Sequence, residues 1–259
     1  MPDPFVRKTY LHAVPDSEWP VRFSIGKRTR ALQLQRFFKT LSAAAAAKSP
    51  PETAGAALSL VVLTQGDWRR QLSAPYGWGL TRRTGEEVVL AAPAAYGPRL
   101  VARYDAVRLR AGRAGVVAPG GVGALLDTLL GLEWAHALIA SRQGGRPPRA
   151  WLREVAAAYL YQAVLRELHD GPRLEYLRRW AEVGVAGAEP TVETPEAFSY
   201  PRGKGPLDDL VWTQGKLWLR AAALGERHGW ALSAPAVRDA AKEAAKEAAR
   251  AAFRVPLAG

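Results

Sequence analysis

Leu132-Glu133-Trp134-Ala135-His136 is the stretch that decides the fold, because it lies in a long apolar helix and carries two chemically active side chains. Apolar residues recur at helical spacing on both sides of it, which predicts a helix over residues 122–141. Glu133 and His136 are three positions apart, so both side chains can lie on one side of that helix.

A second helix, predicted over residues 150–170, carries a further carboxylate, Glu154, 18 positions after His136. It begins Trp151-Leu152-Arg153-Glu154-Val155-Ala156-Ala157-Ala158-Tyr159. The helical motif H-E-x-x-H binds zinc through two histidines, and its glutamate acts as general base on the metal-bound water. Glu133 and His136 are in register with that motif, whereas Leu132 occupies the position of the first histidine.

On these residues the chain resembles the gluzincin class of zinc metallopeptidases, in which a glutamate one helical hairpin after the motif completes the metal site. That glutamate often lies in a W-L-x-E-G-x-A-x-Y context, from which the chain departs at Val155. The resemblance implies that Glu133 is the general base and that His136 and Glu154 are the second and third zinc ligands. Leu132 cannot be the first ligand.

Two protein ligands bind zinc weakly and do not fix the geometry that activates a water molecule. We therefore expect a metallopeptidase-like protein with an incomplete zinc site, no cofactor and no catalytic activity. One alternative is an active zinc peptidase with a substitute ligand, for which the candidates are His12, His169 and His228. Another is a chance match, in which His136 is a buried histidine hydrogen-bonded to Glu154 or to a backbone carbonyl.

The N-terminal half of the chain alternates between strands and helices. Apolar residues alternate with polar ones over 21–25, which predicts a strand, and recur at helical spacing over 27–47. Residues 58–63 form a nearly continuous apolar run, typical of a central strand buried on both faces. A further strand is predicted over 86–92, while residues 94–119 fit either a strand or a short helix.

From residue 120 onward the pattern is helical, with further helices predicted over residues 171–183, 208–228 and 236–253. This order predicts one α+β domain with a small mixed sheet in residues 1–120 and a helical part in residues 121–259. It is similar to the order of a zincin-like catalytic domain.

In the zincin-like family the strand before the motif helix is an edge strand that binds the substrate backbone by strand addition. The resemblance makes residues 86–92 that strand, and an extended peptide or protein segment the expected partner. It places in or near the cleft Tyr76, Trp78, Leu80, Val88 and Val89.

The chain is strongly basic, with a net charge of +12 and a pI near 10.3. Such a balance favours an anionic partner, so a nucleic-acid-binding protein is a further alternative. The arginines are spread along the chain without a consecutive basic block. A solvated basic surface would therefore give the same composition.

The absence of cysteine and asparagine and the single methionine limit the chemistry that the chain can carry out. The chain has no cysteine, which excludes disulfides, thiolate catalysis and cysteine-bound metals. It has one methionine and no asparagine, which fits heat or oxidation tolerance, although GC-rich codon usage explains it equally well.

Without a run of 18 apolar residues or an apolar N-terminal segment, we expect no membrane span and a cytoplasmic location. A mature secreted chain would look the same, and the oligomeric state is left open.

Overall fold

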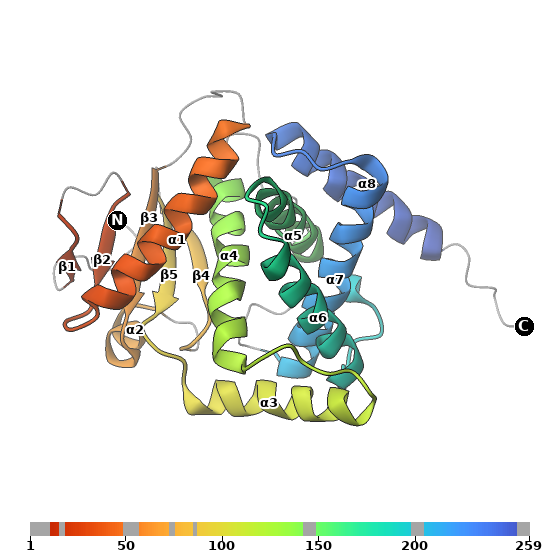
Figure 1. The fold of residues 1–259 in the computed structure, drawn as a ribbon, viewed down its shortest axis with the longest axis horizontal. Helices are drawn as coiled ribbons and strands as arrows, with labels where there is room; N and C mark the ends of the chain where they lie inside the picture. Colours follow the sequence, from red (N-terminus) through yellow and green to blue (C-terminus); the bar gives the residue numbers. More distant parts are fainter. Residues whose placement is uncertain are drawn as a thin grey trace, which may run out of the picture.

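The strands of the N-terminal half form a mixed sheet, seen at the left of Figure 1. The computed structural model describes residues 11–15, 19–48, 57–72, 76–84, 87–141, 149–197 and 205–252. Within these ranges the sheet has five strands in the order β1-β2-β3-β5-β4. Their bounds are β1 His12–Ala13, β2 Val21–Phe23, β3 Ala57–Leu63, β4 Leu80–Thr84 and β5 Glu87–Pro93.

Strand β4, which the sequence pattern did not predict, forms one edge of the sheet. Strands β2, β3 and β5 are parallel, whereas β4 pairs antiparallel with β5, with Thr81 opposite Leu90. The expectation that residues 86–92 form the edge strand is therefore wrong, because β5 lies between β3 and β4.

The two faces of the sheet bury alternate residues of the same strands, as expected for extended chain. Leu60, Val62 and Leu90 belong to the large core on the side of α1 (Arg28–Ala47) and α4 (Val122–Ser141). Val61, Leu63 and Val89 pack on the other side with Trp68 of α2 (Gln65–Gln71). Burial on both faces explains the continuous apolar run of β3.

Helices and the loops that connect them make up the rest of the described chain. The ambiguous segment 94–119 contains a helix, α3, which begins with proline at its first turn, where a missing N–H costs nothing. The helices predicted over 122–141, 150–170, 171–183, 208–228 and 236–253 are confirmed, with end shifts of a few residues. The bounds are α3 Pro98–Arg113, α5 Ala150–Glu167, α6 Gly171–Gly187, η2 Pro195–Ala197, α7 Leu207–His228 and α8 Ala234–Ala252.

Helix α4 is the central helix of the molecule, between the sheet and the helices α5, α6 and α7 (Figure 1). It is long and apolar enough to cross a membrane by length and composition, with a mean hydropathy of 1.4. However, 56% of the most apolar 18-residue stretch of this helix is buried inside the protein. The position of α4 in the core therefore already accounts for its apolar character.

Helices α4 and α5 cross at Gly131, where the backbones approach so closely that only glycine fits. A Cβ atom at this position would collide with the ring of Tyr161. Tyr161 is fully buried, and its hydroxyl donates to the main-chain oxygen of Thr128 at 3.1 Å. This contact fixes the relative position of the two helices that carry the motif residues.

Candidate functional site

Glu133 lies on the side of α4 that faces the edge strand β4. Its side chain is buried, with an exposed fraction of 5% for the residue. The hydroxyl of Thr81 in β4 donates to the main-chain oxygen of Glu133 at 3.0 Å and lies 3.4 Å from its Oε2. A Cβ atom on Gly79 would collide with Glu133 Cγ, so the backbone leading into β4 lies directly against this side chain.

His136 and Glu154, the predicted second and third metal ligands, lie side by side. The Nε2 atom of His136 in α4 is 3.3 Å from Oε2 of Glu154 in α5. Both side chains are largely covered, with exposed fractions of 15% and 17%. The fold therefore brings together two groups from neighbouring helices. Both the metal-ligand hypothesis and the alternative of a buried histidine paired with Glu154 place them close to each other.

Leu132 is buried in an apolar environment. It is 4% exposed and belongs to the main core. It lines a small cavity of about 40 Å³ between α3, α4, α6 and α7. The aromatic side chains that share this cavity are Tyr104, Trp180 and Trp218.

The donor set does not fit a catalytic zinc ion. Such a site needs three protein ligands and an open position for water. Here His136 and Glu154 contact each other, and Leu132 offers no donor atom. Among the residues that the structure describes, no group of three His, Asp or Glu side chains is arranged to hold a metal ion.

The three other histidines are not grouped with this pair in a metal-binding arrangement. His12 lies in β1, at the opposite edge of the sheet from β4, and stacks on Phe23 at 5.7 Å between ring centroids. His169 lies beyond the end of α5 at Glu167, and the helix between Glu154 and Glu167 alone is roughly 20 Å long at 1.5 Å per residue. His228 ends α7 and lines a separate cavity of about 310 Å³.

Tyr76 and Trp78 anchor the segment that leads into β4. The Tyr76 hydroxyl accepts a hydrogen bond from the backbone N–H of Ala95 at 3.2 Å, and partial burial raises the pKa of this phenol. Tyr76 also packs edge-on against Trp68, at 5.6 Å between ring centroids. Trp78 packs against Tyr104 at 5.8 Å. Both predicted cleft residues thus hold the approach to the edge strand in place.

Val88 and Val89 do not lie in an open cleft, which corrects the prediction for both residues. Their exposed fractions are 0% and 2%. Val88 packs against Ala137 and Ala140 of α4, while Val89 joins the core on the α2 side. The physical reason is that β5 is an inner strand, with β4 outside it.

Sequence reasoning missed β4 and its two arginines, Arg82 and Arg83, which are both exposed. The segment is short and polar, so its hydrophobic pattern is weak. A usable signal was present in the spacing, since only two residues, one of them glycine, separate it from β5. A short gap with glycine between two strand-forming segments is typical of a hairpin.

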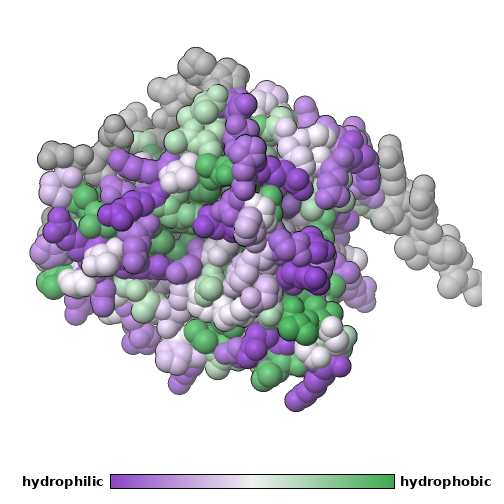
Figure 2. Space-filling model, in the orientation of Figure 1, coloured by the Kyte–Doolittle hydropathy of each residue, from purple (hydrophilic) through white to green (hydrophobic). Residues whose placement is uncertain are grey.

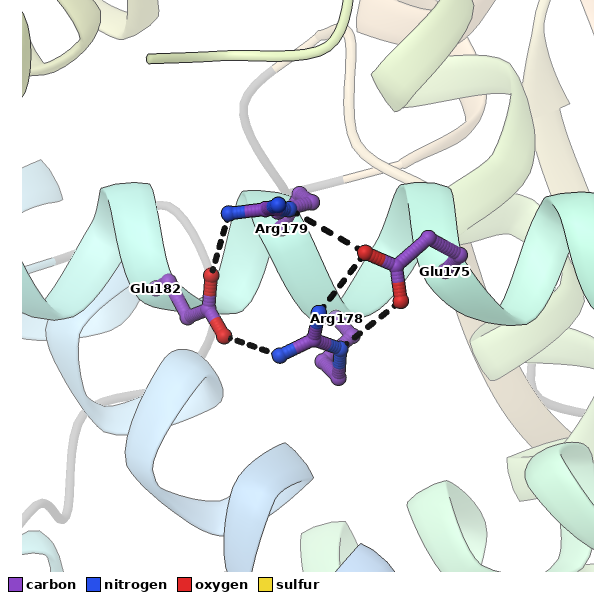
Figure 3. Close-up of polar contacts among 4 residues, drawn as sticks. All are labelled: Glu175, Arg178, Arg179 and Glu182. Atoms are coloured by element: carbon purple, nitrogen blue, oxygen red, sulfur yellow. Dashed lines mark hydrogen bonds and ion pairs between the residues drawn. The ribbon is translucent and has the colours of Figure 1, made fainter. Parts of the chain in front are cut away.

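Several arginines are paired with carboxylates of the same chain. On α6, Arg178 and Arg179 form a closed set of ion pairs with Glu175 and Glu182, drawn in Figure 3. The hydrogen bonds from Arg178 and Arg179 hold the pKa of Glu175 below its usual range. On the face drawn in Figure 2, hydrophilic side chains are interspersed with apolar ones.

Comparisons with protein-family models, with curated proteins and with solved structures found no match to this chain.

Proposed function

We propose that this protein is a metallopeptidase-like domain of zincin-like architecture without a complete zinc site, and that it binds an extended peptide or protein segment along the edge of β4. The observation that carries the proposal is the position of this edge strand. It lies directly on Glu133 through Gly79 and Thr81. One turn further along α4, His136 contacts Glu154.

The free side of β4 is suited to strand addition. Within the described residues, β4 pairs only with β5 and ends the sheet. The edge of a sheet presents unpaired backbone N–H and C=O groups, which an extended segment can pair with. Backbone pairing supplies affinity, and the alternating side chains of the edge strand supply selectivity.

The chemistry of Glu133, which contacts β4 from α4, fits the binding of a peptide segment rather than its hydrolysis. A general base at Glu133 needs a water molecule activated by a metal, and the ligand set for that metal is incomplete. Glu133 instead supports β4 through Thr81. This arrangement favours a strand-binding surface over a hydrolytic site.

Hydrogen exchange measured with and without a mixture of unstructured peptides tests the proposal. We expect slower exchange of the backbone amides in β4. No change is expected in β1, the opposite edge of the same sheet, which serves as an internal control. Equal protection of both edges, or no protection of β4, would contradict the proposed docking edge.

Two of the alternatives from the sequence predict different results. An active zinc peptidase would purify with one zinc per chain and lose it on His136→Ala. A nucleic-acid-binding protein would bind DNA or RNA with an affinity that falls steeply with salt. Metal analysis and a salt titration separate both from the edge-strand proposal.

A further inference from the structure

Two consecutive arginines lie on the edge strand where the proposed function places the docked segment. Arg82 and Arg83 occupy the third and fourth positions of β4, and both are exposed. Consecutive strand residues point to opposite faces of a sheet. The two guanidinium groups therefore lie above and below the same point of the edge.

The contacts of β4 identify the two faces. Arg83 Nη1 donates to the main-chain oxygen of Ala140 at 3.4 Å, so Arg83 lies on the α4 face near the end of that helix. Thr81 lies on the same face, through its bond to Glu133. Leu80 packs with the core on the α2 side, which assigns Arg82 to that face by alternation.

The charges around this edge include carboxylates as well as arginines. On the α4 face, Glu133 lies below Thr81 and is buried. Glu87 is opposite Thr84 at the end of the hairpin. On the α2 face, Arg69 and Arg70 lie in the last turn of α2, with Asp67 in its first turn. Within β4 itself the charged residues are Arg82 and Arg83, and both are exposed.

In an extended segment added beside β4, successive side chains point to opposite faces of the sheet, as they do in β4 itself. Residues directly opposite each other on paired strands have Cβ atoms roughly 4.5–5.5 Å apart, and opposite charges at such positions attract. The residues facing Arg82 and Arg83 would be neighbours in the sequence of the docked segment. Two consecutive carboxylates would therefore match the two arginines, one on each face.

We propose that the partner docking on β4 is an acidic extended segment with two adjacent Asp or Glu residues, held opposite Arg82 and Arg83. This inference rests on the proposed function. The residue opposite Thr81 is then small and polar, and the residue opposite Leu80 is apolar. An antiparallel segment reads acidic-acidic-polar-apolar from its N-terminus, and a parallel segment reads the reverse.

Fluorescence anisotropy with labelled synthetic peptides tests this inference. The peptides share one extended sequence, in both residue orders, and carry Glu-Glu, Gln-Gln or Lys-Lys at the two positions. We expect the Glu-Glu peptide to bind the full chain about tenfold more tightly than the Gln-Gln peptide, since two cross-strand charge pairs are involved. The preference should shrink as salt is raised.

Two double variants with the same change in net charge test whether the preference for Glu-Glu peptides depends on Arg82 and Arg83. The variant R82E/R83E should lose the preference for Glu-Glu and favour Lys-Lys. The control R99E/R103E changes two exposed arginines of α3 and should keep the original preference. A milder variant, R82Q/R83Q, should bind Glu-Glu and Gln-Gln peptides equally, and circular dichroism confirms that each variant folds.

The outcomes separate this inference from the proposed function. If no peptide of any charge binds, the docking function itself fails, and the inference with it. If Gln-Gln or Lys-Lys peptides bind as tightly as Glu-Glu, the edge binds segments but the acidic partner is wrong. An equal loss in R82E/R83E and R99E/R103E would show a general charge effect and overturn the assignment to β4.

Discussion

His136 and Glu154 join the two central helices at the position of the motif: the imidazole Nε2 lies 3.3 Å from the carboxylate Oε2. The contact spans the interface between α4 and α5 and is largely covered from solvent. One turn earlier on α4, Leu132 faces an apolar cavity. The two polar groups are therefore paired with each other, and the neighbouring position that would complete a metal site is part of the core.

Mutations of His136 and Glu154 should have non-additive effects on the free energy of unfolding. In a double-mutant cycle with His136→Ala and Glu154→Ala, we expect a coupling free energy of about 1 kcal/mol, as for a polar pair largely covered from solvent. The control is the pair Asp239 and Lys242 on α8, 3.0 Å apart but about 70% exposed. Exposed pairs contribute little, so its coupling should be close to zero in the same urea titrations. Similar coupling in both pairs would contradict the covered contact.

Gly131 should tolerate no side chain. A Cβ atom there collides with the Tyr161 ring, so Gly131→Ala should lower the free energy of unfolding by about 2–3 kcal/mol through overpacking. Gly123 lies in the first turn of the same helix, where a Cβ meets no atom within 4 Å. The control Gly123→Ala should therefore raise stability by up to about 1 kcal/mol. Equal effects in denaturant titrations would refute the close helix crossing.

Tyr161 should make the protein less stable at high pH. Burial raises the pKa of its phenol well above the ordinary value of 10.0. Above about pH 10 the unfolded chain loses this proton while the folded chain keeps it, so the free energy of unfolding falls as pH rises.

In Tyr161→Phe the contribution of this phenol to the pH dependence disappears, while that of other phenols with a raised pKa, such as Tyr96, remains. The slope of unfolding free energy against pH above pH 10 should become less steep by up to about 1.4 kcal/mol per unit, the value for one proton. Chemical denaturation at a series of pH values measures it. The same slope in both proteins would show that the folded phenol ionises normally.

The helical half of the fold could be predicted from the sequence because each helix carries its own apolar periodicity. Proline at the start of α6 and the glycine-rich breaks in the sequence also mark helix ends locally. The strand β4 could not be recognised from its own residues, because Arg82 and Arg83 are polar and its position depends on pairing with β5. The error about the edge strand and the misplaced Val88 and Val89 both follow from that omission.

Part of the candidate site could also be predicted. The sequence places His136 and Glu154 on two consecutive helices, and the packing of these helices brings the two side chains into contact. This contact does not distinguish metal ligands from a buried histidine paired with a carboxylate. The support of β4 by Glu133 depends on Gly79 and Thr81, more than fifty residues earlier in the chain. Such long-range packing leaves no periodic signal in the sequence.

The most direct test of the account is zinc binding by Leu132→His, measured by calorimetric titration and mass spectrometry on protein without a histidine tag. Histidines at positions 132 and 136 would lie on one helix face beside Glu154 and provide three ligands. We expect one zinc per chain in this variant, none in the unaltered protein, and loss of binding when His136→Ala is added. A folded variant that takes up no zinc, or an unaltered protein that already carries one zinc per chain, would contradict the account.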